Sequence, residues 1–108
     1  MEVIMDIPKA IELLENEWNV VDLTGFFGHL KVDVFDDEGL QRVKDILNEV
    51  ELPESGEVNK RFVELTWFIP TFLHWQRPAW VQDGKDTKKL DEAIDFFEMR
   101  LTTILGLP

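Results

Sequence analysis

The segment from Val58 to Trp80 restricts the possible folds of this 108-residue chain more than any other stretch does. Apolar residues recur there at helical spacing, and the segment holds three of the four tryptophans and three of the eight phenylalanines. A helix that is apolar around most of its surface must be covered on several sides, so we predict a central helix over 57–76. Pro70 has no N–H and would clash with the carbonyl of Thr66, so we expect a kink or a break there.

Three other segments combine helical periodicity with residues that begin or end helices. In the first segment, Pro8 occupies the first turn, where its missing N–H costs nothing. The second segment stops before Pro53, because a residue that precedes proline avoids the helical region. Packed around the central helix, these segments predict an all-α chain folded as a small four-helix bundle, in a single domain over 1–108. The segments and their candidate N-caps are 7–18 after Asp6, 37–50 after Asp36 or Asp37, and 87–105 after Asp86.

The stretch 20–35 carries conflicting signals. Its first half fits one helix face, but Gly25 and Gly28 each weaken a helix by about 1 kcal/mol. Residues 30–34 alternate apolar and charged side chains, which is a strand pattern, yet no second strand pattern accompanies it. We therefore predict a short helical turn followed by an extended connection, with a small β-hairpin as the alternative.

Turn-forming residues follow the central helix and predict a loop over 77–84. Trp75 and Trp80 flank Arg77 at this end of the chain's central segment. Tryptophan and arginine are enriched where partners bind, so these three residues are candidates for a contact surface; the alternative is that both rings fold back over the end of the bundle. The residues predicted to form the buried core are Phe62, Leu65, Trp67, Ile69, Leu90, Ile94, Phe97 and Leu101.

The residues that usually carry catalysis are scattered along this sequence. His29 and His74 are far apart, and neither has a second histidine or a cysteine at metal-ligand spacing. Ser55 is the only serine, and it lies beside no histidine, in a linker where it can cap the central helix. We therefore expect no enzyme, no catalytic residue, no metal site and no cofactor.

The charge of the chain points towards a class of partner. Acidic residues outnumber lysine and arginine by 22 to 11, and residues 1–54 carry fourteen acids against four bases, a net charge of −10 of the total −11. A nucleic-acid binder needs a basic surface, whereas an acidic surface attracts basic proteins; the alternative is that these acids only keep the surface solvated. The candidate acidic partner-binding residues are Asp33, Asp36, Asp37, Glu38, Asp45 and Glu49.

The cysteine content and the hydropathy of the chain indicate the cellular compartment in which it works. The chain contains no cysteine, which excludes a disulfide framework and fits a reducing compartment. The N-terminal residues show no basic region followed by an apolar run, and no segment reaches the roughly 20 apolar residues of a membrane span. We expect a soluble cytoplasmic protein that contacts neither membrane nor nucleic acid.

In size, acidity and lack of cysteine, the whole chain resembles the small acidic toxin-immunity proteins of bacteria. The resemblance is one of type and carries over no individual residue. It implies a non-enzymatic inhibitor that binds a basic toxin domain through an acidic surface. The alternative function is a helical domain that self-associates or docks through its aromatic face, so the oligomeric state stays open. Salt should weaken the first kind of binding and leave the second unchanged or strengthen it.

Overall fold

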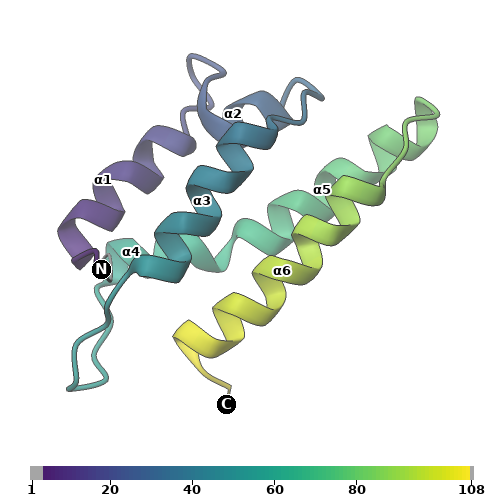
Figure 1. Ribbon diagram of the computed structural model, residues 1–108. Helices are drawn as coiled ribbons and strands as arrows, with labels where there is room; N and C mark the ends of the chain where they lie inside the picture. Colours follow the sequence, from purple (N-terminus) through teal and green to yellow (C-terminus); the bar gives the residue numbers. More distant parts are fainter. Residues whose placement is uncertain (1–3, 108) are drawn as a thin grey trace.

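The computed structural model describes residues 4–107 and shows an all-α chain (Figure 1). Within that range the backbone forms no β-sheet, only an isolated parallel bridge between Met5 and Val50. None of the helices in the described part of the chain is both long and apolar enough to span a bilayer. The helices are α1 (Ile7–Glu17), α2 (Gly25–Leu30), α3 (Asp37–Glu49), α4 (Lys60–Trp67), α5 (Ile69–Gln82) and α6 (Lys88–Leu105).

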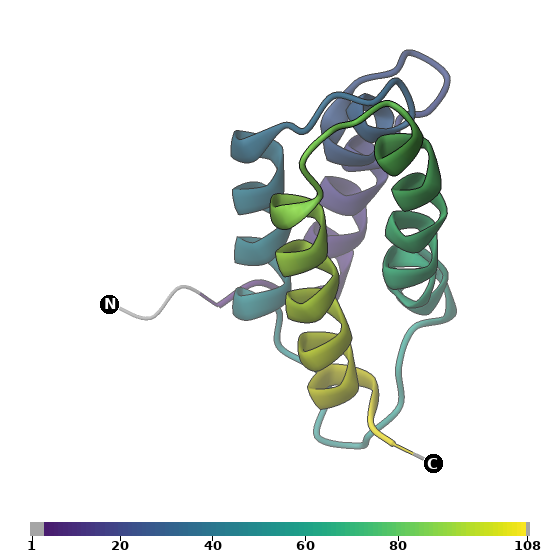
Figure 2. The ribbon, with the colours of Figure 1, turned by 90° about the vertical axis from the view of Figure 1, so that its right-hand side faces the viewer.

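The helices pack as a small bundle, as the sequence predicted. α1 packs against α3 and α4, and α6 packs against α5, α3 and α4. Figure 2 shows α6 between α3 and the α4–α5 column, with α1 behind them. α4 and α5 follow one another as a bent column, so the four predicted helical segments become four columns of the bundle. The short α2 packs against α1 and α3 and closes one end.

The predicted central helix is interrupted near Pro70. α4 ends at Trp67 and α5 begins at Ile69, with Phe68 between them at φ −80° and ψ −13°. Pro70 stands in the first turn of α5, where no helical N–H is required of it, so the expected break is confirmed. The start of this segment was predicted incorrectly: α4 begins at Lys60 rather than near residue 57.

The N-terminus of α4 shows why the helix begins late. The Asn59 side chain accepts hydrogen bonds from the backbone N–H groups of Arg61 and Phe62, at 2.8 and 3.4 Å. Asn59 is therefore the N-cap, in place of the predicted Ser55. The Ser55 hydroxyl instead accepts from the N–H of Glu57 within the preceding loop.

The loop predicted over 77–84 is wrong in its first part, because α5 continues through Pro78 to Gln82. A proline inside a helix destabilises it by about 3 kcal/mol. Contacts made by residues after Pro78 must therefore stabilise the last turn of α5. Trp80 supplies them: its ring is 5% exposed and meets Phe35 edge-on at 6.1 Å, and the Lys85 ammonium lies 5.3 Å from the ring centre. The burial of Trp80 therefore offsets the loss at Pro78, which local turn preference does not anticipate.

The core runs continuously through all six helices. Seven of the eight predicted core residues are buried, and Trp67 is the exception at 55% exposure. In α4 the buried positions are Phe62, Leu65 and Thr66, which share one face at helical spacing. Trp67 lies two positions beyond Leu65, about 200° around the helix, and therefore points away from the core.

Of the other three predicted N-caps, two are confirmed. The Asp6 carboxylate accepts from the N–H of Lys9 at 2.9 Å, and the Asp36 carboxylate accepts from the N–H of Gly39 at 2.9 Å. The third differs by one residue, because α6 has Thr87 as its N-cap. Asp86 still accepts a hydrogen bond from the N–H of Lys88, at 2.9 Å.

Residues 20–35 contain the predicted short helix, α2, and the hairpin alternative is wrong. Gly25 begins α2 with φ +73°, and a Cβ at this position would lie 2.5 Å from the Asn16 carbonyl oxygen and from the Glu17 Cα. The glycine is therefore required by the close approach of α2 to the end of α1. A helix this short depends on such contacts, because isolated helices of this length are unstable.

Candidate functional site

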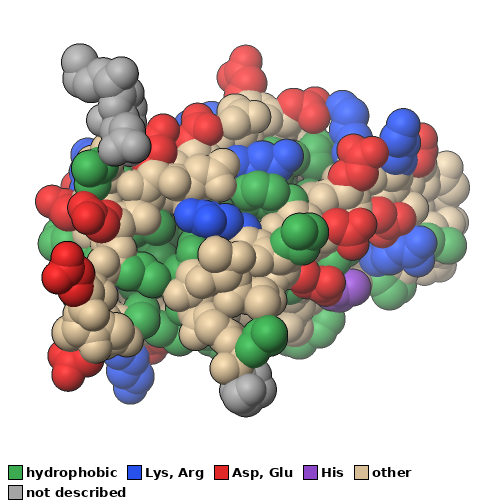
Figure 3. Space-filling model, turned by 60° about the horizontal axis from the view of Figure 1, so that its bottom comes forward, with side chains coloured by type: hydrophobic (Ala, Val, Ile, Leu, Met, Phe, Trp, Pro, Cys, Tyr) green, Lys and Arg blue, Asp and Glu red, His purple; other side chains and the backbone are tan. Residues whose placement is uncertain are grey.

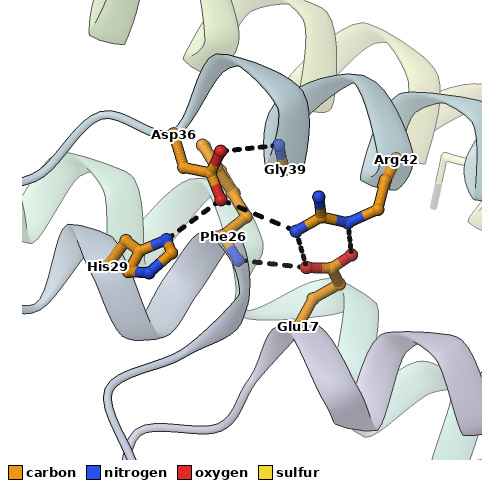
Figure 4. Close-up of polar contacts among 6 residues, drawn as sticks. All are labelled: Glu17, Phe26, His29, Asp36, Gly39 and Arg42. Carbon is orange, nitrogen blue, oxygen red and sulfur yellow. Dashed lines mark hydrogen bonds and ion pairs between the residues drawn. The ribbon is translucent and has the colours of Figure 1, made fainter.

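A polar network joins α1, α2 and α3 at the end of the bundle (Figure 4). The Glu17 carboxylate is 5% exposed and accepts two hydrogen bonds from the Arg42 guanidinium, at 2.8 and 3.1 Å. It also accepts from the backbone N–H of Phe26 at 3.1 Å, which satisfies one of the free donors at the N-terminus of α2. Glu17 therefore ties its own helix to both neighbours.

Asp36 forms the second half of the network. One of its carboxylate oxygens accepts from Gly39, while the other lies 2.9 Å from His29 Nδ1 and 3.5 Å from Arg42 Nη2. Burial raises the pKa of Asp36, but the hydrogen bonds from Gly39 and His29 and the charge of Arg42 outweigh burial, and the net pKa is below the ordinary 3.8. The hydrogen bonds that Arg42 donates to Glu17 raise the pKa of Arg42. These groups remain charged at neutral pH.

The network has the features of a structural joint. All four carboxylate oxygens of Glu17 and Asp36 are occupied by donors from the chain itself. A general base needs a free lone pair and a pKa near the working pH, and Asp36 offers neither. The other histidine, His74, lies 2.9 Å from Glu98 on the surface of the bundle. Within residues 4–107, no group of His, Asp and Glu has the arrangement of a metal site.

The structure divides the predicted acidic surface into engaged and free carboxylates. Asp36 belongs to the joint, and Asp37 pairs with Lys89 of α6 at 3.0 Å. Asp33 is half-buried in a left-handed conformation at φ 62°, and its carbonyl oxygen accepts from the Lys85 ammonium. The carboxylates of Asp36 and Asp37 are thus engaged within the fold, whereas Asp33 contributes only its backbone carbonyl, and within residues 4–107 no cation lies within 4.0 Å of its carboxylate.

The remaining three acids form what we call the α3 acidic stripe: Glu38, Asp45 and Glu49. Spacings of seven and four residues place them on one face of α3. Glu38 and Asp45 are exposed and Glu49 is half-buried. Among the described residues, no lysine, arginine or histidine lies within 4.0 Å of their carboxylates. Asp45 accepts only a neutral hydrogen bond, from Gln41 at 2.8 Å.

Acidic side chains also lie on other faces of the molecule. Figure 3 views the end of the bundle that carries the C-terminus; acidic side chains lie around its edges and hydrophobic ones gather between them. Several basic side chains on this face stand beside acidic ones. Arg42 lies between Glu38 and Asp45 on the same face of α3, but it binds Glu17 and Asp36, so within residues 4–107 the three stripe acids have no cation within 4.0 Å.

Trp75, Arg77 and Trp80, which were predicted to form a contact surface, lie in three different environments. Trp75 is 66% exposed, whereas Trp80 is buried and cannot contact a partner in this fold. The Arg77 guanidinium binds the Asp91 carboxylate at 2.9 Å, and this hydrogen bond, together with one from Thr87, lowers the pKa of Asp91. Of the two tryptophans predicted at this surface, only Trp75 is exposed.

Trp75 stands at the wall of a hollow that we call the aromatic groove, with a volume of about 560 Å³. Trp75 packs edge-on against Phe68 at 5.0 Å, and Trp18 packs against Phe72 at 5.1 Å. Trp18 is also stacked on Phe27 at 3.9 Å. The residues that define the groove are Trp18, Lys31, Leu65, Phe68, Phe72 and Trp75.

Sequence reasoning did not find the joint or the groove. Glu17 and Arg42 are 25 residues apart, and neither lies in a motif. The one visible signal was Gly25 and Gly28: their presence in a helical stretch indicates close backbone approach. The Cβ clashes at both glycines support that interpretation, since a Cβ at Gly28 would lie 2.6 Å from the Asn19 carbonyl oxygen.

Comparisons of the chain with protein-family models, with curated proteins and with solved structures found no match. The functional argument therefore rests on the α3 acidic stripe and the aromatic groove.

Proposed function

We propose that this protein is a non-enzymatic binding domain that captures a basic protein partner through the α3 acidic stripe. A toxin domain that the protein would inhibit, as immunity proteins do, is the partner that best suits its size and charge. The observation that carries the proposal is the absence of any cation within 4.0 Å of Glu38, Asp45 and Glu49 among residues 4–107.

The distribution of charge around α3 supports the proposal. Asp36 and Asp37, at the N-terminus of the same helix, are both neutralised by cations of the chain. Like charges on one helix face repel each other and reduce stability, and among residues 4–107 no cation lies within 4.0 Å of these three. A basic partner would relieve that repulsion, and the field of the net charge of −11 would increase its rate of encounter.

The test compares two triple variants of equal charge. The stripe variant carries Glu38→Gln, Asp45→Asn and Glu49→Gln. The control variant carries Glu54→Gln, Glu57→Gln and Asp83→Asn, three exposed acids outside α3. Differential capture from the protein's own host, with both variants beside the wild type, identifies partners that need the stripe. Where a neighbouring gene encodes a large secreted protein, its basic C-terminal domain is the ligand for kinetic measurements.

Electrostatic steering predicts the outcome of those measurements. At low salt the stripe variant should associate roughly tenfold more slowly than the wild type, and moderate salt should reduce that difference. The control variant should lose much less, although its net charge is the same. Equal losses in the two variants would show that only net charge matters, and the stripe would then have no specific role.

A further inference from the structure

The aromatic groove has an apolar floor without free hydrogen-bonding groups. The Trp18 indole N–H donates to the Leu65 carbonyl at 2.8 Å, so this ring offers only its apolar surface to a ligand. Phe68 and Phe72 contribute hydrocarbon alone. A ligand seated here must therefore bury an apolar body, because a polar group in this position would lose its hydrogen bonds to water without replacement.

The rim of the groove carries two cations, Arg61 and Lys31, and the carboxylate of Glu64. Arg61 lies 3.0 Å from Glu15 and 3.7 Å from Glu64, so its charge is already balanced. Lys31 is exposed, and within residues 4–107 no carboxylate lies within 4.0 Å of its ammonium. In a chain with twice as many acids as bases, an unbalanced lysine beside an apolar hollow is selective for an anion.

Gln76 adds a neutral polar group to the same rim. Its amide nitrogen donates to the Phe72 carbonyl at 3.2 Å, and within residues 4–107 its second N–H and its amide oxygen have no partner. Lys31 and Gln76 both line the hollow, and they offer a carboxylate one charged and one neutral hydrogen-bond donor. The hollow of about 560 Å³ lies within the range of small-molecule sites, roughly 300–1,000 Å³.

We infer that the aromatic groove binds a small amphipathic monocarboxylate, with its hydrocarbon body between Trp75 and Phe72 and its carboxylate at Lys31. A second copy of the chain fits less well, because two molecules of charge −11 repel each other. A basic protein segment fits less well because it would approach the unbalanced lysine. This site is independent of the α3 acidic stripe, so either proposal can fail without the other.

The experiment uses three eight-carbon probes that differ only in the head group: octanoate, 1-octanol and octylammonium. Binding to the ¹⁵N-labelled full chain is followed by the four indole N–H signals, which Trp→Phe variants assign. Octanoate should shift the Trp75 and Trp18 signals and leave the distant, buried Trp80 signal unchanged. It should also bind more tightly than octylammonium, although the net charge of the protein favours the cation.

Two lysine variants with the same net charge separate the local contact from the overall field. Lys31→Gln should weaken octanoate binding about fivefold, the upper end for an exposed ion pair, and leave octanol binding unchanged. Lys88→Gln, at an exposed lysine in the first turn of α6, should leave both unchanged. Trp75→Ala should weaken all three probes.

Four results would overturn the inference. Octylammonium that binds as tightly as octanoate would remove the role of Lys31, as would equal losses in Lys31→Gln and Lys88→Gln. Uniform shifts of all four indole signals would indicate non-specific adsorption. Sedimentation equilibrium of the free protein gives the fourth: a dimer that Trp75→Ala abolishes would assign the groove to a second copy of the chain.

Discussion

Replacement of Glu17 by alanine tests whether the buried joint holds α1, α2 and α3 together. The substitution removes the acceptor of the Phe26 N–H, and the loss of a helix N-cap costs about 0.5–2 kcal/mol. It also removes charged hydrogen bonds from Arg42, for which about 1.5–3 kcal/mol is usual. The Arg42 side chain is 51% exposed, so water replaces the lost acceptor. The loss of these hydrogen bonds should therefore lie at the lower end of that range. We expect the free energy of unfolding to fall by about 2–4 kcal/mol in total.

Urea unfolding followed by circular dichroism at 222 nm measures this loss. Glu15→Ala is the matched control: Glu15 lies in the same helix and pairs with Arg61, but both side chains are about half exposed, so the loss should stay below about 1 kcal/mol. A double-mutant cycle of Glu17→Ala with Arg42→Met should give a coupling of about 1–2 kcal/mol. A loss for Glu17→Ala no larger than that of the control would refute the role of the joint.

Four further substitutions test the packing, the close approach of α2 to α1 and the charge state of Asp36. Phe97→Ala should reduce the free energy of unfolding by about 3–5 kcal/mol in urea, because Phe97 is fully buried, whereas Trp67→Ala should cost less than about 1 kcal/mol; similar losses would contradict the burial pattern. Gly25→Ala should lower the thermal midpoint, since its Cβ has no space and φ is positive, and an unchanged midpoint would contradict the close approach. The lowered pKa of Asp36 stabilises the fold at pH values above the unfolded pKa of about 3.9, and that contribution disappears as pH falls through the folded pKa; Asp36→Asn should therefore flatten the acid-side loss of stability in urea titrations, and a parallel curve would oppose the assignment.

Periodicity and capping in the sequence were sufficient to predict the helices and most of the core. The apolar stripe of α6 placed Leu90, Ile94 and Phe97 in the interior, and all three are buried. Pro70 marked the break because its effect depends only on the residues around it. These features succeed because each is decided by contacts within a few residues of chain.

The incorrect predictions concern residues whose environment is decided by distant parts of the chain. Pro78 by itself predicts a turn. Phe35 and Lys85 contact the Trp80 ring, and these contacts stabilise the last turn of α5. Trp67 is apolar, yet its angular position on α4 leaves it exposed. Amino-acid type alone does not distinguish these two tryptophans.

The candidate partner surface was predicted only in part for the same reason. Net charge marks the first half of the chain as acidic but cannot tell which carboxylates find a cation. Lys89 comes from α6 to neutralise Asp37, and Arg42, six residues along the chain from Asp36, pairs with Asp36. Only the helical spacing of Glu38, Asp45 and Glu49 was visible in the sequence, and these three residues make up the stripe.

The most direct test of the proposed function locates the bound partner on the surface. The ¹⁵N-labelled chain is titrated with the basic partner domain, and the backbone amide shifts are mapped along the sequence. The account predicts that the largest changes occur between Glu38 and Glu49, on the exposed face of α3. Changes concentrated around Phe68 and Trp75, with α3 unaffected, would contradict it.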